Sequence, residues 1–265
     1  MVSGPRRQSP AGCRDAGCAL VGGETAEHPG LIEPGGFDLA GACVGIVERD
    51  ELIDSRAAGT GDIVLGLAAN GLHANGYSLV RTLIEQWQLD LNRPYQEQLR
   101  LTLGDAEADA AISAEPAHTL ATIGEVLLAP TPIYARGLLA TRTTLRAAGH
   151  DLAGIAHITG GGLPGNAPRM LPPPLAVRLD PSRWRVPSVI RLFAALGGLD
   201  DEEMRATFNG GLGMTVAVAA DAVDPALTAF AADGIDACVV GEVVASDDLE
   251  GHRYAEAALS TARGR

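Results

Sequence analysis

The sequence predicts an α+β protein in which a mixed sheet is layered with helices. Strand-like and helix-like segments follow one another without the strict β–α alternation of a doubly wound parallel sheet. Hydrophobic residues make up 46% of the 265 residues, so the chain can bury a sizeable core. Aromatic residues make up only 4%, so leucine, valine, isoleucine and alanine must fill most of that core.

The first part of the chain contains two apolar runs that predict strands. Residues 18–21 form a short run that ends at a glycine pair, and residues 37–47 are apolar and small. Residues 50–61 are polar and rich in turn formers, which predicts a domain boundary.

The second part begins with an expected strand over residues 62–68 and a glycine-punctuated loop over residues 70–76. Ser78 is a candidate N-cap for a helix whose apolar face continues to Trp87. Residues 89–117 are polar, acidic and irregular, and we expect a surface excursion there. The remaining expected elements are helices over residues 133–148, 187–196, 201–208 and 225–232, and strands over residues 154–158, 214–218 and 237–244.

The charge composition excludes several classes of function. The formal net charge is −13, which argues against nucleic acid and membrane surfaces as partners, because both attract basic proteins. All 20 basic residues are arginines, so a Walker A loop, a protein-kinase site and Schiff-base chemistry by a lysine of this chain are excluded. GC-rich codon usage is the simplest explanation of the missing lysine.

The cysteines and the hydropathy pattern predict a cytoplasmic protein. Cys13, Cys18, Cys43 and Cys238 form no C-x-x-C pair, so a zinc ribbon or thioredoxin-like site is not expected. A few scattered cysteines fit a reducing compartment. No uncharged apolar stretch of about 18 residues occurs, and the N-terminal residues lack the apolar core of a signal peptide.

The tetrapeptide G-G-E-T follows the first expected strand and is a candidate nucleotide site. Gly22 and Gly23 allow the backbone to approach a phosphate closely, and their N–H groups can cradle it. Glu24 offers a hard oxygen ligand for Mg²⁺, and Thr25 adds a hydroxyl. The same residues also fit a tight turn with a solvated glutamate.

The segment G-L-H-A-N-G-Y-S, residues 71–78, joins an expected strand to an expected helix. A helix N-terminus attracts phosphate. His73 is a candidate for proton transfer or for donation to a phosphoryl oxygen, and Asn75 is a candidate for holding a carbonyl or a ribose hydroxyl. A structural or exposed histidine is the alternative interpretation.

Two later segments are also rich in glycine. H-I-T-G-G-G, residues 157–162, predicts a backbone anion nest, and Arg169 can add a bidentate phosphate contact. F-N-G-G-L-G-M, residues 208–214, can bring backbone against a ligand. The alternatives are a flexible turn for the first segment and close strand packing for the second.

The residues of these segments and their order along the chain together resemble the phosphoribosylformylglycinamidine cyclo-ligase family, the aminoimidazole ribonucleotide (AIR) synthetases. The resemblance covers residues 11–248 in one register. It is carried by G-C-A-L-V-G-G-E-T-A-E-H-P-G, G-D-I-V-L-G-L-A-A-N-G-L-H-A-N-G-Y-S-L-V-R, L-L-A-P-T-P-I-Y, I-A-H-I-T-G-G-G, T-F-N-G-G-L-G-M and G-E-V-V-A-S-D. Related kinases and synthetases of the same superfamily differ around residues 22–25 and 71–76.

The resemblance implies ATP-dependent ring closure in purine biosynthesis. ATP phosphorylates the formamide oxygen of formylglycinamidine ribonucleotide, the amidine nitrogen attacks the activated carbon, and phosphate leaves. Positioning and charge neutralisation dominate such phosphoryl transfers, so ATP and Mg²⁺ are the expected cofactors. The family has no P-loop, which agrees with the absence of lysine.

The resemblance also implies roles for individual residues. Glu24 would bind magnesium, and His73 and Asn75 would face the active site as catalytic residues. The expected cofactor-binding residues are Gly22, Gly23, Glu24 and Thr25, and the expected substrate-binding residues are Gly160, Gly161, Gly162, Arg169 and Asn209.

The implied domains are a partial N-terminal ATP-binding and dimerisation domain over residues 1–56 and a C-terminal AIR-synthase-type domain over residues 57–265. Family members carry a longer N-terminal segment, so much of the first domain is expected to be absent. The homodimer of the family is therefore in doubt for this chain, and exposed apolar strands and poor solubility are expected. The alternative function is an inactive remnant that binds substrate or pairs with a full-length subunit.

Overall fold

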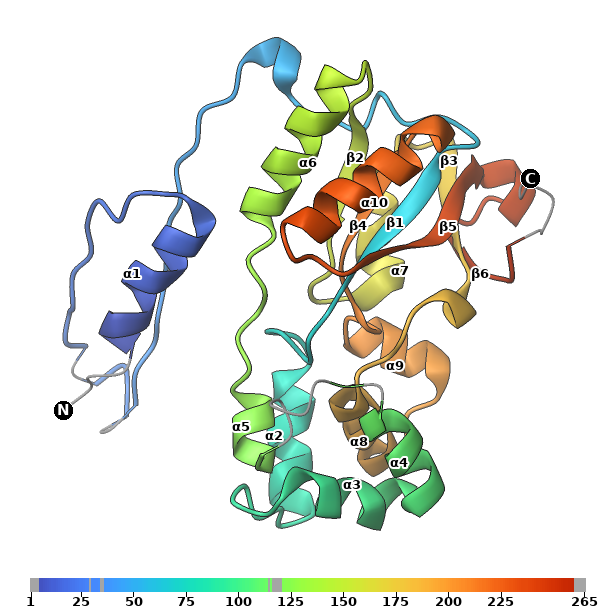
Figure 1. The fold of residues 1–265 in the computed structure, drawn as a ribbon. Helices are drawn as coiled ribbons and strands as arrows, with labels where there is room; N and C mark the ends of the chain where they lie inside the picture. The colour runs from blue at the N-terminus through green and yellow to red at the C-terminus, as the bar shows by residue number, and fades with distance from the viewer. Residues whose placement is uncertain (1–4, 29, 34–35, 114, 116–120, 260–265) are drawn as a thin grey trace. The chain divides into compact units, whose positions relative to one another are not determined.

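A computed structural model describes residues 5–28, 30–33, 36–113, 115 and 121–259 (Figure 1). Its internal contacts divide the chain into two units, Met1–Leu52 and Ile53–Arg265. The first unit contains helix α1 (Pro5–Ala16) and the 3₁₀ helix η1 (Arg49–Glu51), and the described residues between them form no further helix or strand. The domain boundary expected between residues 56 and 57 stays a prediction.

The prediction of two strands in the first unit is wrong. Residues 18–28 and 36–48 form no strand, and the side chains of Val44 and Ile46 are 93% and 98% exposed. An apolar run becomes a strand only when a neighbouring strand satisfies its backbone and covers one face. No such neighbour occurs among the described residues of this unit, so the β propensity of these runs is not realised.

The second unit is built on a six-stranded sheet. The strand order is β2-β4-β1-β5-β3-β6, and neighbours are antiparallel except the parallel pair β3 and β6. In the centre, Leu65 lies opposite Val216 on one side and Val239 on the other. The strands are β1 (Ile63–Ala68), β2 (Leu152–His157), β3 (Leu175–Leu179), β4 (Leu212–Val218), β5 (Ala237–Ala245) and β6 (Tyr254–Glu256).

Helices cover the sheet and form a separate layer at one end of it (Figure 1). Two long helices, α6 (Ala135–Ala147) and α10 (Val223–Ala232), pack together over one face of the sheet. The end layer consists of α2 (Tyr77–Gln86), α3 (Tyr95–Leu103), α4 (Asp105–Ser113), α5 (Ile123–Leu127), α8 (Ser188–Gly197) and α9 (Asp201–Thr207). The short helices are α7 (Gly162–Asn166), η3 (Ala167–Met170), η4 (Pro181–Arg183), η5 (Ala220–Ala222) and η6 (Ser246–Leu249).

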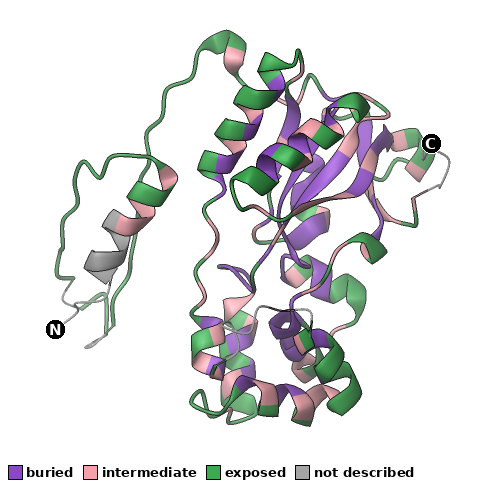
Figure 2. Cartoon of the chain, viewed as in Figure 1, coloured by how far each residue is buried: buried purple, intermediate pink, exposed green. Residues whose placement is uncertain are grey.

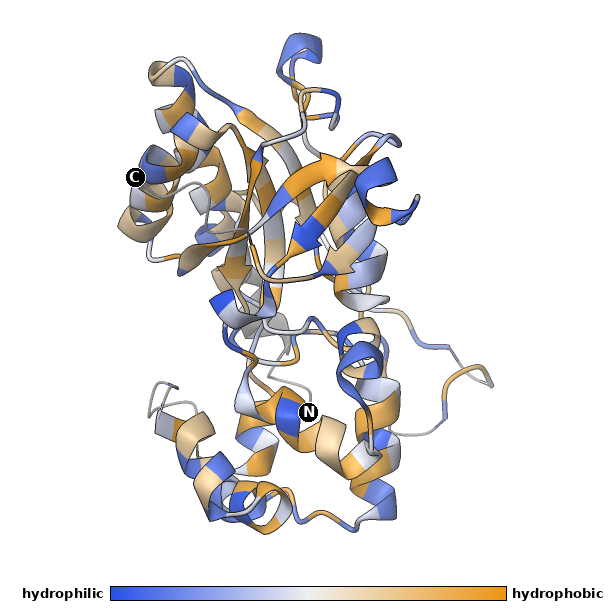
Figure 3. Ribbon diagram, turned by 90° about the vertical axis from the view of Figure 1, so that its right-hand side faces the viewer, coloured by the Kyte–Doolittle hydropathy of each residue, from blue (hydrophilic) through white to orange (hydrophobic). Residues whose placement is uncertain are grey.

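Three hydrophobic clusters hold this unit together, and the buried residues line the sheet and the inner faces of the helices (Figure 2). Neighbouring residues of β1 point to opposite faces, as strand geometry requires. Leu65 packs with Phe230 on the α6–α10 side, whereas Val64 packs with Leu163 and Met170 on the other side. Both faces of the sheet are therefore covered, and hydrophobic residues run along its strands (Figure 3).

The third cluster lies among the helices of the end layer and includes residues of α3 and α4. Residues 89–117 were expected to be an irregular surface excursion, but most of them form α3 and α4. Tyr95 and Leu99 of α3 and Ala108 of α4 are completely buried. The helices are nine residues each, so their few apolar positions are too sparse to produce a clear period in the sequence.

The α+β class is confirmed, as are the elements expected at β1, β2, β4, β5, α6, α8, α9 and α10. Ser78 is not the N-cap of α2: Gly76 occupies that position in a left-handed conformation, and Ser78 lies inside the helix. A side chain at Gly76 would collide with Phe208, so only glycine fits at this turn.

In the part of the chain that is described, no helix has the length and apolar character needed to cross a membrane.

Candidate functional site

Three loops of the second unit meet at one end of the sheet. Strands β1 and β2 both pair antiparallel with β4, so their C-terminal ends lie beside the start of β4. The backbone N–H of Ala69 donates to the carbonyl of Gly211 at 2.9 Å, and that of Ile158 donates to Gly213 at 2.9 Å. The loops that follow β1 and β2 and the loop that precedes β4 are thereby brought together.

Two asparagines fasten these loops to one another. The Nδ2 of Asn75 donates to the carbonyl of Ile158 at 3.2 Å. The Nδ2 of Asn209 donates to the carbonyl of Gly71 at 2.8 Å, and its Oδ1 accepts the N–H of Gly211 at 2.9 Å. Because both ends of the buried Asn209 amide are engaged by backbone, it shapes the loops directly, and its contact with a substrate stays a prediction.

The glycine triplet contains two exposed residues and one buried one. Gly160 and Gly161 are open to solvent, whereas Gly162 begins α7 and is buried. The Nδ2 of Asn166 donates to the carbonyls of Thr159, Gly160 and Gly162 at 3.1, 3.1 and 2.8 Å. This side chain ties the turn together, which leaves Gly160 and Gly161 as the part of the triplet that a ligand can reach.

Arg169 lies on the exposed side of the same turn. Its Nη1 donates to the Oδ1 of Asn166 at 3.2 Å, and the rest of the side chain faces solvent. A guanidinium held by one neutral hydrogen bond retains donors for an anion. The predicted phosphate contact of Arg169 is compatible with this arrangement and stays a prediction.

His73 has the most unusual environment of the predicted site residues. Its backbone has a positive φ of 58°, a conformation that few non-glycine residues adopt. The side chain is only 7% exposed, yet neither Nδ1 nor Nε2 has a hydrogen-bond partner among the described residues. Buried polar atoms normally have a hydrogen-bond partner. An imidazole whose two nitrogens lack one is therefore a candidate for binding a ligand.

Burial, with the nearby charge of His157 as a smaller cause, lowers the pKa of His73 to about 4. The ring is therefore neutral near pH 7, with one nitrogen that donates and one that accepts. Such a ring can hydrogen-bond a substrate group or accept a proton from it. Both roles expected for this residue, proton transfer and donation to a phosphoryl oxygen, are compatible with a neutral ring and stay predictions.

Two residues next to His73 cannot be recognised as site residues from the sequence alone. His157 lies at the exposed end of β2, opposite Met214 of β4. Tyr134 is buried just before α6, and its ring centroid is 6.4 Å from that of His73. They belong to the segments I-A-H-I-T-G-G-G and L-L-A-P-T-P-I-Y, but only the folded structure shows that they lie next to His73.

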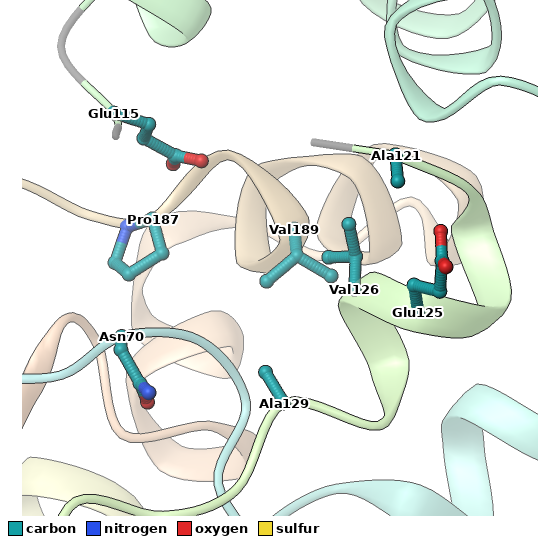
Figure 4. A pocket seen from close by; sticks show the side chains of 8 residues that line it. All are labelled: Asn70, Glu115, Ala121, Glu125, Val126, Ala129, Pro187 and Val189. Atoms are coloured by element: carbon teal, nitrogen blue, oxygen red, sulfur yellow. The ribbon is translucent and has the colours of Figure 1, made fainter. Parts of the chain in front are cut away.

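A cavity of about 260 Å³ lies in the helical layer next to the loop that follows β1 (Figure 4). Its apolar walls come from α5 and the start of α8, and Asn70 and two carboxylates line it as well. Glu115 accepts the N–H of Ser188 at 2.5 Å, and Glu125 belongs to the capping box of α5. The lining residues are Asn70, Glu115, Ala121, Glu125, Val126, Ala129, Pro187 and Val189.

Gly22, Gly23, Glu24 and Thr25 belong to the first unit, where they lie in exposed chain without regular structure. Beyond Glu24, this segment offers no cluster of carboxylates, and no group of three or more possible metal ligands occurs among the described residues. A magnesium ion bound through one or two carboxylates takes its other ligands from phosphates and water. Glu24 fits such a site as one ligand, and the nucleotide-binding roles of the four residues stay predictions.

Comparison with known proteins agrees with the motifs. The family model for the C-terminal domain of AIR synthase related proteins matches residues 59–253. The phosphoribosylformylglycinamidine cyclo-ligase of Sorangium cellulosum is 44% identical over 238 residues, covering 90% of this chain and 62% of the relative. That of Synechococcus elongatus is 42% identical over 237 residues, covering 89% and 62%. A solved thiamine-monophosphate kinase from Stenotrophomonas maltophilia is 14% identical, with a TM-score of 0.41 over 79% of this chain and 54% of the kinase.

The chain thus spans about 62% of the length of these curated relatives. The family match covers the five strands β1 to β5 and all three loops of the site, and it ends one residue before β6. The chain belongs to the AIR synthase related protein family, whose C-terminal domain forms its second unit.

Proposed function

We propose that this chain takes part in the ATP-dependent closure of formylglycinamidine ribonucleotide to aminoimidazole ribonucleotide. The observation that carries the proposal is the buried His73, whose ring nitrogens have no hydrogen-bond partner among the described residues. His73 lies inside G-L-H-A-N-G, one of the segments by which the chain resembles the cyclo-ligases. The curated relatives at 40–44% identity carry the cyclo-ligase name. Because the chain spans about 62% of their length, their activity comes to it only as part of this proposal.

The proposed reaction proceeds in two steps. The formamide oxygen of the substrate takes the γ-phosphoryl group of ATP, which turns that oxygen into a leaving group. The amidine nitrogen then bonds to the formyl carbon, phosphate leaves with the oxygen, and one proton is released. Bound Mg²⁺ would neutralise charge on the phosphates, with Glu24 of this chain as one ligand.

The residues of this chain would act mainly by positioning. The neutral His73 would accept a hydrogen bond or the released proton from the amidine, because it stays unprotonated near pH 7. The exposed Gly160 and Gly161, together with Arg169, would hold the substrate phosphate. Asn75 and Asn209 would keep the three loops in register around these groups.

The test is incubation of the chain with formylglycinamidine ribonucleotide, ATP and Mg²⁺, with ADP and aminoimidazole ribonucleotide measured by chromatography. We expect product from the unaltered chain, and a loss of about a hundredfold or more in His73→Asn, since general acid–base groups contribute about 10²–10⁴-fold. Asparagine also adopts positive φ, so this variant keeps the loop. His252→Asn, at an exposed histidine, is the matched control and should retain full activity.

The alternative is a chain that binds the substrate without closing its ring. Titration calorimetry with formylglycinamidine ribonucleotide alone separates the two functions. Binding without turnover would support the alternative, and absence of both would contradict the assignment of this site.

A further inference from the structure

The wall behind His73 is formed by an aromatic ring and a glycine from two different elements. Tyr134 precedes α6, and Gly213 lies in β4. The rings of His73 and Tyr134 are tilted by 54° with their centroids 6.4 Å apart. The ring of His73 thus lies beside that of Tyr134, more than 60 residues away along the chain. The proposed ring closure assigns no role to Tyr134.

Gly213 is required by the closeness of both rings. A Cβ at this position would lie 2.1 Å from the Oη of Tyr134 and 2.8 Å from the Cε1 of His73. Separations below about 3 Å are not tolerated between such atoms, so even alanine would displace one of the rings. The backbone of β4 therefore sets how deeply the imidazole lies.

The Tyr134 ring is itself anchored. Its hydroxyl donates to the carbonyl of Ala68, the last residue of β1, at 2.8 Å. Burial raises the pKa of this hydroxyl, which keeps it protonated and able to donate. Since β1 leads directly into the loop that carries His73, one hydrogen bond joins the start of α6 to the base of that loop.

Among the described residues, three elements contribute the groups considered next to His73. Of the elements against it, β4 contributes the uncharged Gly213, the start of α6 contributes the neutral Tyr134, and the end of β2 contributes His157, whose charge acts on the ring. The position of the imidazole is thus set by packing against Tyr134 and Gly213, and its nitrogens are left without partners among the described residues.

We propose that Tyr134 is a positioning residue for His73: together with Gly213 it holds the imidazole buried, with neither nitrogen hydrogen-bonded to a described residue. The consequence for ring closure rests on the proposed function, but the positioning itself does not. A misplacement of about 1 Å can cost a catalytic group about a hundredfold in rate. Tyr134 would therefore affect turnover without touching the substrate.

The test is a pH titration of the histidine side chains by NMR in the full chain with ¹⁵N-labelled histidine. His73→Asn identifies the signal of His73. In the unaltered chain we expect this signal to titrate near pH 4, and in Tyr134→Ala to move toward the ordinary value near 6.5, because water enters the space of the ring. An unchanged titration in a folded Tyr134→Ala variant would overturn the proposal.

Tyr134→Phe provides a second measurement if the alanine variant does not fold. It keeps the ring and removes only the hydrogen bond to Ala68, so we expect the ¹⁵N shifts of His73 to change while its pKa stays low. Tyr254→Phe is the matched control, because Tyr254 lies in β6 at the opposite edge of the sheet and should leave His73 unchanged. Equal shifts in both variants, or no shift in Tyr134→Phe, would refute the positioning role. Since no turnover is measured, this outcome is independent of whether the chain closes the ring.

Discussion

The buried His73 couples the site to the stability of the protein through pH. Burial holds the pKa of its imidazole near 4 in the folded chain, whereas an unfolded histidine has a pKa near 6.5. Between these values the unfolded chain binds a proton that the folded chain does not. The contribution of His73 is therefore neutral above about pH 6.5 and increasingly destabilising as the pH falls toward 4.

We predict that His73→Asn reduces the loss of stability between pH 6.5 and pH 4. A single group contributes at most about 1.4 kcal/mol per pH unit, so the difference is measurable by urea denaturation at several pH values. His252→Asn at an exposed position should follow the unaltered chain throughout. Parallel pH profiles for His73→Asn and the unaltered chain would show that His73 is not protected from protonation.

Gly162 offers a second prediction at the scale of one residue. It has a φ of 57°, and a Cβ there would lie 1.6 Å from the carbonyl oxygen of Arg205. We predict that Gly162→Ala lowers the free energy of unfolding by about 3 kcal/mol, from overpacking and backbone strain together. Gly165→Ala is the control in the same short helix, where nothing lies within 4 Å, and should be neutral or slightly stabilising. Similar losses in both variants, measured by urea denaturation, would exclude this explanation.

At the level of single residues, the sequence identifies glycines and polar groups of the site but not their tasks. The motif containing His73 indicates a functional loop, whereas the neighbours of the ring cannot be inferred from spacing. Tyr134 and Gly213 are far from His73 along the chain and meet it only because β1 and β4 are paired. Asn209 was expected to bind the substrate, but its amide nitrogen and oxygen both hydrogen-bond to backbone groups. No local sequence pattern indicates these hydrogen bonds.

At the scale of elements, an ion pair fastens the edge strand β6 to α9. The Nε of Arg205 donates to the Oε2 of Glu256 at 2.5 Å, and the guanidinium carbon lies 5.8 Å from the ring centre of Trp184. The indole N–H of Trp184 in turn donates to the carbonyl of Gly210 at 2.8 Å. The loop before β4 is thus linked through Trp184 and Arg205 to the edge strand β6.

We predict that Glu256→Gln destabilises the protein by about 3 kcal/mol. Removing one charge of a largely buried pair leaves the other uncompensated, and Arg205 is only 8% exposed. Asp109→Asn is the matched control, because it breaks the solvent-exposed pair with Arg100, which should contribute less than about 1 kcal/mol. The measurement is urea denaturation, and equal effects of the two changes would mean that the Arg205 pair is effectively solvated.

The elements that the sequence predicts correctly are those with long or uniform apolar patterns. The central strands β1 and β4 are covered on both faces, so they read as continuous apolar runs. The short strands β3 and β6 and the helices α3 and α4 are defined by their partners more than by their own residues. The same dependence explains the error at residues 37–47, which have strand composition but no strand beside them among the described residues.

At the scale of the whole molecule, the two units differ in how they use their apolar residues. All buried members of the three hydrophobic clusters belong to the second unit. In the first unit Val21, Val44 and Ile46 are each more than 90% exposed. Contiguous exposed apolar chain of this kind favours self-association, even though a net charge of −13 opposes it.

We predict that a chain consisting of residues 53–265 unfolds cooperatively and aggregates less than the full chain. Since the hydrophobic clusters remain intact, its melting temperature should lie within roughly 2–4 °C of the full-length value, which corresponds to less than about 1 kcal/mol. Circular dichroism reports the melting transition, and light scattering reports aggregation. A full chain carrying Val44→Ser and Ile46→Ser is the matched control, because it removes apolar surface without shortening the chain. If the shortened chain loses its cooperative transition, or if the serine variant aggregates as much as the unaltered chain, then the first unit contributes to the fold through contacts other than these exposed side chains.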